Sequence, residues 1–257
     1  MKNMSILLTA TLVAASLVVP VNAKSKSLYV LTRMTTQQGS SHRDLRLSYN
    51  KKGLLTKTVF TQPDESSESS DSHSSTSTTI YSYKGTRLMK VSWSSDHASE
   101  TDDYRYSKNK IVITMHSGDE TFTDTCLLKG NKIVKTFSSE HTTQTYTYNK
   151  KGQFVKRFDK FGTIQDGYKY DKKGYAYCFN GNDMDISGHF TLKYTYKHDL
   201  PSTVKQYHGK KLRAIYHFYY KKMKVSAYSS AKDQQYSFLH KDDPKGDFLY
   251  NMSWMTD

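Results

Sequence analysis

The sequence predicts an all-β protein built from one antiparallel meander of about eight consecutive hairpins, forming a single twisted or curled sheet. A phrase of two alternating tyrosines, a polar residue, two lysines and a glycine occupies residues 146–152 and 168–174, and recurs in shorter form at residues 48–53. Related units follow one another at intervals of about 22 residues. Beyond the N-terminal segment, no stretch shows helical periodicity over three turns.

The first 23 residues have the pattern of an export signal. Lys2 provides the positive start, residues 6–21 are almost wholly apolar, and Val21, Asn22 and Ala23 form a small-x-small cleavage site. This apolar run is shorter than the ~20 residues that cross a bilayer as a helix. We therefore expect a mature chain that starts near Lys24 and is secreted and associated with the cell surface, with no stable membrane insertion after cleavage. A retained membrane anchor is the alternative.

The composition is that of a basic, hydrophilic chain with many tyrosines. Lys and Arg number 38 against 24 Asp and Glu, for a net charge of +14. With 21 tyrosines and few aliphatic residues, we expect aromatic rings to cover a partly buried sheet. The two cysteines, Cys126 and Cys178, fall on strands of different repeat units, too far apart for a disulfide in a flat sheet, so two isolated thiols are expected.

Each repeat unit is predicted to be a strand, a tight turn and a second strand. Tyrosines two residues apart lie on the same face of a strand, so the rings should form a ladder across the sheet. The members of this predicted aromatic face are Tyr81, Tyr83, Tyr104, Tyr106, Tyr146, Tyr148, Tyr168, Tyr170, Tyr194 and Tyr196. Such rings either provide the burial that sparse aliphatic residues cannot or, if exposed, form platforms for sugars.

The hairpin-repeat domain is expected to span residues 47–230. Within it, a Ser-, Asp- and Glu-rich insertion at residues 61–79 has no strand pattern and is expected to be a mobile loop. Residues 24–46 are expected to form an N-terminal cap strand and linker. Residues 231–257 lose the phrase but keep aromatic residues, which indicates a C-terminal cap over the open edge of the sheet.

The units resemble YD repeats, the tyrosine–aspartate repeats of the rearrangement-hot-spot family and of Gram-positive wall-associated proteins. Tyr170 and Asp171 keep the literal dipeptide, and Gly85, Arg87 and Leu88 keep the residues that usually follow the turn. At the other units asparagine, lysine or serine replaces the aspartate. The resemblance covers residues 47–228 and implies a spiralling antiparallel sheet with a carbohydrate-binding role.

The turns within the hairpins carry the candidate binding residues. In a meander all of these turns fall on one edge of the sheet, about 10 Å apart, and acidic residues such as Asp96, Glu100 and Asp119 fall on the opposite edge. We expect the basic edge to bind an anionic cell-wall polymer or polysaccharide; the alternative is that lysines merely solubilise the turns and prevent edge pairing. The candidate polyanion-binding residues are Lys51, Lys52, Lys84, Lys108, Lys110, Lys150, Lys151, Lys172, Lys173, Lys221 and Lys222.

No motif in the sequence indicates catalysis. It contains no nucleophile elbow, no His-Glu-x-x-His and no phosphate-binding glycine loop. Histidines stand beside acidic residues in several loops, as at His97 and His116, but successive loops would lie too far apart to share one metal ion. We therefore expect a monomer that is not an enzyme and has no cofactor, no metal site and no nucleic-acid partner. The alternative function is a structural or partner-docking protein, associated with a toxin or an adhesin, that uses the sheet edge or the tyrosine face.

Overall fold

The computed structural model describes residues 25–63, 74–139, 142–182, 187–239 and 244. The expected signal segment and most of the expected C-terminal cap lie outside these residues, as do residues 64–73 of the expected insertion. The elements are β1 (Lys26–Gln38), β2 (Ser41–Tyr49), β3 (Leu55–Pro63), β4 (Ser74–Lys84), β5 (Arg87–Ser94), β6 (Ser99–Ser107), β7 (Lys110–Ser117), β8 (Glu120–Lys129), β9 (Lys132–Phe137), β10 (Thr143–Tyr148), β11 (Phe154–Phe158), β12 (Ile164–Tyr170), β13 (Ala176–Asn182), β14 (Ser187–Lys197), β15 (Leu200–His208), β16 (Lys211–Val225) and α1 (Tyr228–Leu239).

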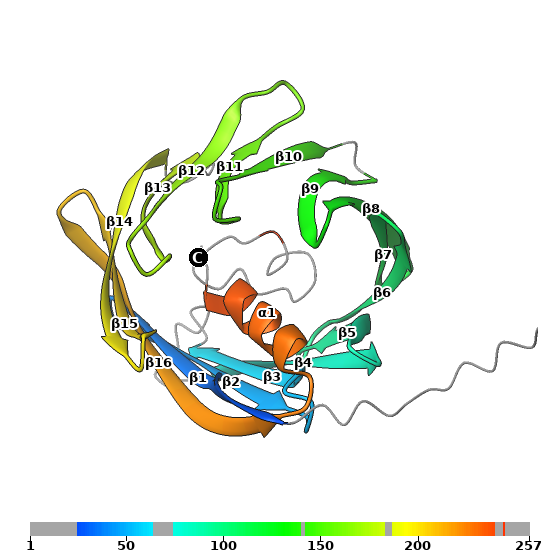
Figure 1. Cartoon of the computed structure of the whole chain (residues 1–257), viewed down its shortest axis with the longest axis horizontal. Coiled ribbons are helices and arrows are strands. Elements are labelled where there is room, and N and C mark those ends of the chain that lie inside the picture. The colour runs from blue at the N-terminus through cyan, green and yellow to red at the C-terminus, as the bar shows by residue number, and fades with distance from the viewer. Residues whose placement is uncertain (1–24, 64–73, 140–141, 183–186, 240–243, 245–257) are drawn as a thin grey trace, which may run out of the picture.

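The described strands form one closed antiparallel barrel rather than an open sheet (Figure 1). Each strand pairs with its neighbours in the sequence, and β1 also pairs with β16. The prediction of an all-β meander is thus confirmed, but the prediction of a single open or curled sheet is wrong. The insertion expected at residues 61–79 is also shorter than predicted, because β3 continues to Pro63 and β4 begins at Ser74.

The barrel closes because the last repeat unit takes its second strand from the N-terminus. Phe218 lies on β16 opposite Met34 of β1, where the sequence predicted a local hairpin. β16 therefore continues through Lys221 and Lys222, which pair with residues of β1 instead of forming a turn. The N-terminal residues expected to cap the sheet are full members of its wall.

The two ends of the barrel are formed by different sets of turns. We call the end formed by the turns at residues 50–54, 85–86, 108–109, 130–131, 149–153, 171–175 and 198–199 the turn rim. The opposite end, formed by the turns at 39–40, 95–98, 118–119, 159–163 and 209–210, is the loop rim. Antiparallel pairing alternates the direction of successive strands, so every within-hairpin turn reaches the same rim.

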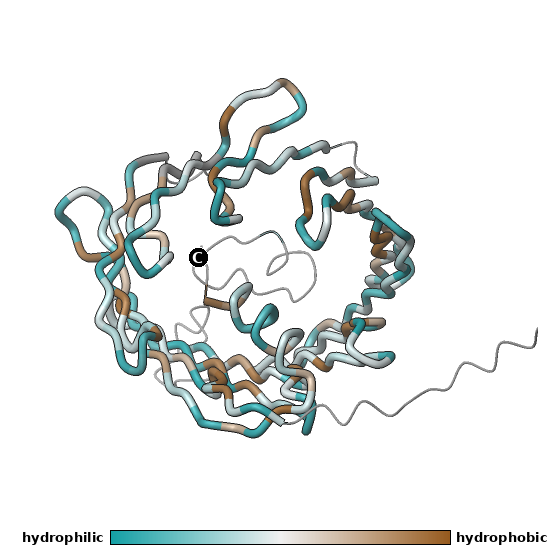
Figure 2. The backbone as a smooth tube through the Cα atoms, in the orientation of Figure 1, coloured by the Kyte–Doolittle hydropathy of each residue, from teal (hydrophilic) through white to brown (hydrophobic). Residues whose placement is uncertain are grey.

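The hydrophobic core lines the inner face of the barrel. Tyr81, Tyr104, Tyr146 and Tyr168 are each 5% exposed or less and belong to one cluster with Phe238 of α1, which lies inside the ring (Figure 1). The residues that alternate with them point outward and are mainly polar or charged, such as Ser82, Arg105, Thr147 and Lys169, so hydrophilic and hydrophobic positions alternate along the backbone (Figure 2).

Tyrosine hydroxyls satisfy backbone carbonyls beside β-bulges. Five tyrosines donate to the carbonyl of the residue that precedes the bulged residue on the neighbouring strand, and the bulge is where the regular ladder is interrupted. The pairs are Tyr49 to Leu31 (2.6 Å), Tyr148 to Ile133 (2.5 Å), Tyr170 to Phe154, Tyr194 to Ala176 (2.6 Å) and Tyr220 to Pro201 (2.8 Å). The repeated phrase therefore requires tyrosine, and not phenylalanine, at these positions.

The helix α1 was not anticipated from the sequence. Its Gln234, 2% exposed, accepts a hydrogen bond from the Leu55 amide and donates one to the Tyr83 hydroxyl, both at 2.8 Å. Gly53 makes room for the chain that leads into the helix, because a Cβ atom there would lie 2.5 Å from Val225. A polar anchor of this kind leaves no apolar helical period to detect.

The two cysteines are buried and free, as expected. Cys126 lies on β8 and Cys178 on β13, which are separated by several strands of the wall.

Replacing Tyr170 with phenylalanine tests the role of the hydroxyl caps. The ring and its packing are kept, but the half-buried Phe154 carbonyl loses its donor, which should lower the free energy of unfolding by about 1–2 kcal/mol. Urea denaturation measures the change. Tyr177→Phe is the matched control, since Tyr177 is 41% exposed and should change stability by less than ~0.5 kcal/mol. Equal stability of Tyr170→Phe and the wild type would contradict the proposed cap.

Candidate functional site

The closed barrel gathers most of the predicted lysines on the turn rim. Lys51, Lys52, Lys84, Lys108, Lys110, Lys150, Lys151, Lys172 and Lys173 all lie in or beside its turns, and all are exposed. Lys221 and Lys222 are also exposed but stand on β16, so they belong to the wall. Successive turns are two strands apart, about 10 Å along the rim.

Three of the lysine pairs lie in turns of the same backbone conformation, each of which begins with an Asn or Asp side chain that accepts hydrogen bonds from the turn. Asn149 Oδ1 accepts hydrogen bonds from the amides of Lys151 (2.9 Å) and Gln153 (3.0 Å), and Gly152 has a φ of 82°. Asn50 and Asp171 begin turns of the same kind. Because the polar side chain fixes the backbone, the two lysines between it and the glycine are directed to the solvent.

Few carboxylates neutralise this rim. Within the described residues, one predicted lysine forms an ion pair: Lys173 Nζ lies 2.7 Å from Asp199 Oδ1. That hydrogen bond and the lysine's charge lower the pKa of the Asp199 carboxyl. Lys52 Nζ donates instead to the Gly85 carbonyl at 3.1 Å. The rim therefore carries an excess of positive charge available to an external anion.

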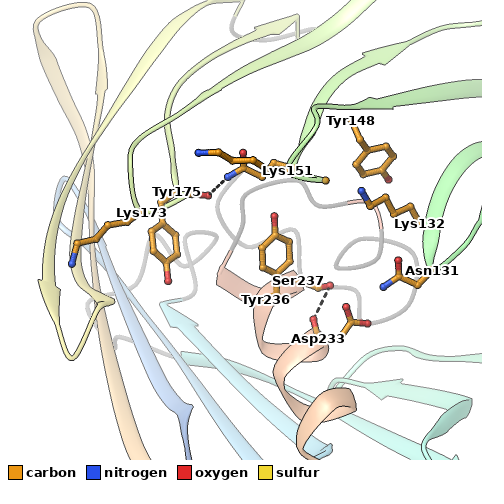
Figure 3. A pocket seen from close by; sticks show the side chains of 12 residues that line it. Asn131, Lys132, Tyr148, Lys151, Lys173, Tyr175, Asp233, Tyr236 and Ser237 are labelled. Carbon is orange, nitrogen blue, oxygen red and sulfur yellow. Dashed lines mark hydrogen bonds between the residues drawn. The ribbon is translucent and has the colours of Figure 1, made fainter.

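A pocket of about 420 Å³ opens between three turns of this rim and α1 (Figure 3). Lys132, Lys151 and Lys173 line it from the turns, and Asp233, Tyr236 and Ser237 line it from the helix (Figure 3). Lys132 Nζ lies over the Tyr148 ring, 4.9 Å from its centroid, and so close to Gly152 that a Cβ atom there would be 2.4 Å from it. The positive φ of Gly152 favours glycine here, and a larger residue would also displace the end of the Lys132 side chain.

The helical part of this pocket could not be found from the sequence. Asp233, Tyr236 and Ser237 belong to no repeat, and no local signal links them to turns that precede them by some 60 to 100 residues. Lys132 begins β9 just after the turn at residues 130–131, and its place beside Gly152 follows from the pairing of neighbouring hairpins.

The predicted aromatic face belongs to the core. Its four deepest rings are buried, and the other six, Tyr83, Tyr106, Tyr148, Tyr170, Tyr194 and Tyr196, are half-buried and packed against them. Tyr194 and Tyr196 stack with ring centroids 5.8 Å apart. These rings face the inside of the barrel, so their structural role is the one that the geometry supports.

The loop rim is acidic over β5 to β8. Asp96, Glu100 and Asp119 lie there, and Asp102 points toward the core side of β6. Burial, followed by the nearby Glu100, raises the pKa of Asp102 to about 6, although a hydrogen bond with Tyr104 acts in the opposite direction. The described residues include no group of three side chains placed to hold a metal ion.

In the described part of the chain, no helix is long and apolar enough to span a membrane.

Neither a protein-family model nor a curated protein matches the sequence. Among solved structures, the chain is similar to a porin-like protein from Bacteroides uniformis, with a TM-score of 0.37, 10% sequence identity, and coverage of 74% of this chain and 98% of that one. It is also similar to a porin-like protein from Bacteroides vulgatus, with a TM-score of 0.34, 11% identity, and coverage of 76% and 99%. At this identity the likeness concerns the fold alone.

The prediction of no stable membrane insertion is wrong, because the reasoning behind it does not apply to a closed barrel. It rested on the length of apolar runs, whereas closed barrels cross a bilayer with short alternating strands and contain no such run. The chain forms a closed barrel, so the length of its apolar runs is not a valid test of membrane insertion. Contact with a bilayer depends instead on the outward side chains, which are mainly polar along the wall and include apolar residues at the loop rim.

Replacing Asp102 with asparagine tests the environment of this carboxyl. Its pKa in the folded protein, about 6, is above the ordinary value of 3.8, so the native state favours the protonated form and loses stability as the pH rises through this interval. The melting temperature of Asp102→Asn should exceed that of the wild type near pH 7.5 and should lose most of this advantage near pH 4.5. Asp96→Asn, in an exposed turn, is the control; a difference that does not vary with pH would contradict the shift.

Proposed function

We propose that this chain is a non-catalytic protein of the cell envelope that binds anionic polysaccharides or wall polymers along its turn rim. The observation that carries the proposal is the succession of exposed lysines at the turns of one rim. Among the described residues, one of these predicted lysines, Lys173, forms an ion pair with a carboxylate. No residue of the site needs to act as an acid, a base or a nucleophile. The anionic character of the proposed ligand follows from the lysines, and the resemblance to YD repeats adds the expectation of a carbohydrate.

The spacing of the turns suits a polymer better than a single small anion. Neighbouring lysine pairs are about 10 Å apart, close to the Debye length of about 8 Å at physiological salt, so each pair adds to the potential of the next. A chain of phosphates or carboxylates lying along the rim meets several pairs at once. Each pair contributes little alone, and their sum supplies the affinity.

The turn conformation supports the same ligand. Backbone amides of the lysine turns donate hydrogen bonds to the side-chain oxygens of Asn50, Asn149 and Asp171, which fixes the backbone before any ligand arrives. Only the lysine side chains then lose freedom on binding, which lowers the entropic cost of association.

Four substitutions at two neighbouring turns test this proposal. The variant Lys150→Gln, Lys151→Gln, Lys172→Gln, Lys173→Gln should bind poly(glycerol phosphate) at least about tenfold more weakly than the wild type, measured by isothermal titration in about 50 mM NaCl. The matched control carries Lys57→Gln, Lys90→Gln, Lys193→Gln and Lys205→Gln, which remove the same charge from the outer wall. It should keep most of the affinity.

The salt dependence provides a second measure. Wild-type affinity should fall steeply between about 50 and about 300 mM NaCl, and less steeply for the turn variant. An equal loss of affinity in both lysine variants would show that net charge, and not the rim, is responsible. Binding that does not change with salt would favour apolar docking of a partner protein and contradict the proposal.

A further inference from the structure

One turn of the loop rim repeats the lysine turns with a different side chain. Asp159 Oδ1 accepts hydrogen bonds from the amides of Phe161 (2.9 Å) and Thr163 (2.8 Å), and Gly162 has a φ of 80°. In the turn-rim equivalents the position of Phe161 is a lysine, as at Lys151. The same rigid turn thus presents a phenylalanine at the opposite end of the barrel.

Phe161 is held out in the solvent. Its side chain is 81% exposed, and Asp159 is further fixed by a 3.0 Å hydrogen bond from Gln165 Nε2. The hairpin that carries it projects outward from the ring, between β11 and β12 (Figure 1). A large apolar side chain fixed in water by a well-bonded turn is placed for contact with something outside the chain, because the backbone needs no further ordering when Phe161 is buried.

Other exposed apolar side chains are found at the same rim. Phe137 (36% exposed) ends β9, Ile164 (47%) begins β12 and Leu212 (43%) is the second residue of β16. With Phe161 they make up four of the seven large apolar side chains that are exposed among the described residues. Phe161 and Ile164 share one hairpin, whereas Phe137 and Leu212 belong to other strands, so the four side chains are distributed over several elements of the rim.

Cations accompany these side chains. Lys160 Nζ lies 5.0 Å from the centroid of the Phe161 ring, and Lys135 Nζ lies 4.8 Å from that of Phe137. Lys211 and Arg213 flank Leu212 in the sequence. Among the described residues, Asp96, Glu100 and Asp119 of the loop rim lie on or between β5 to β8, away from this region. Asp166 stands on β12, opposite Arg157, and the Asp159 carboxylate accepts the hydrogen bonds of its own turn.

We propose that the loop rim between β9 and β16 docks on an anionic lipid bilayer, with Phe161 entering the interface. Apolar side chains bury in the acyl boundary while neighbouring ammonium groups reach the headgroup phosphates, which is the chemistry of Phe161 with Lys160 and of Phe137 with Lys135. A protein partner requires a continuous surface of about 1,000 Å² or more, whereas a fluid surface adapts to separate anchors. This contact lies at the opposite rim from the proposed polymer site and does not depend on it.

Co-sedimentation with vesicles tests the docking. The wild type should bind vesicles of phosphatidylcholine with about 30% phosphatidylglycerol and bind pure phosphatidylcholine much more weakly. Phe161→Ser should reduce binding to the anionic vesicles about tenfold, and Lys160→Gln about fivefold. Ile80→Ser removes an apolar side chain that is 51% exposed on the wall and should bind like the wild type.

A fluorescence measurement locates the contact. Phe161→Trp should show a blue shift on adding anionic vesicles, after subtraction of the wild-type signal from the two native tryptophans. The four-lysine variant of the turn rim should keep its vesicle binding, which separates this proposal from the polymer site.

Several outcomes would overturn the docking. These are the absence of wild-type binding, equal binding of Phe161→Ser, or equal binding to both kinds of vesicle. Loss of vesicle binding in the turn-rim variant alone would place the contact at the other end of the barrel. If Phe161→Ser instead abolishes self-association measured by sedimentation without vesicles, the rim is an interface between copies of this chain.

Discussion

The pairing of β1 with β16 is the constraint on which the rest of the structure depends. Eleven residue pairs join the two strands, between Lys26 and Gln37 on one side and Ile215 and Val225 on the other. An open meander would leave two long unpaired edges, and closure removes both. It also turns the two borders of a sheet into two rims around an interior, so the position of every turn and of α1 follows from it.

The interior explains why tyrosine dominates this chain. In the unit of Tyr168 and Tyr170, the first ring is buried in the inner wall and the second is half-buried, with its hydroxyl donating to a carbonyl beside a bulge. In the unit of Tyr194 and Tyr196, the first hydroxyl makes this bond. The bulges increase the local twist and bend the strands, which helps a sheet to curl. A bulged residue on one strand and a tyrosine hydroxyl on the next, which bonds the carbonyl beside the bulge, thus recur together in five places.

One turn design serves two surfaces. A polar side chain, two residues and a glycine with positive φ form a rigid turn whose central side chains are free to vary, because the backbone hydrogen bonds do not involve them. With lysines at both central positions the turn contributes charge to the turn rim, and with Phe161 it presents an apolar anchor at the loop rim. The two ends of the barrel therefore differ in chemistry while sharing their local structure.

The sequence by itself determined the local structure. The period of two, the turn glycines and the repeat interval depend on residues that are near one another in the chain, so the hairpins, the two separated thiols and the lysines of the turn rim could be predicted. Only the tertiary structure decided that Phe218 would pair with Met34 and not with a local strand, that Lys221 and Lys222 would lie in the wall, and that Gln234 would anchor a helix inside it. These contacts join residues about 150 to 190 positions apart and arise from the curvature summed over the whole sheet, which no local pattern records.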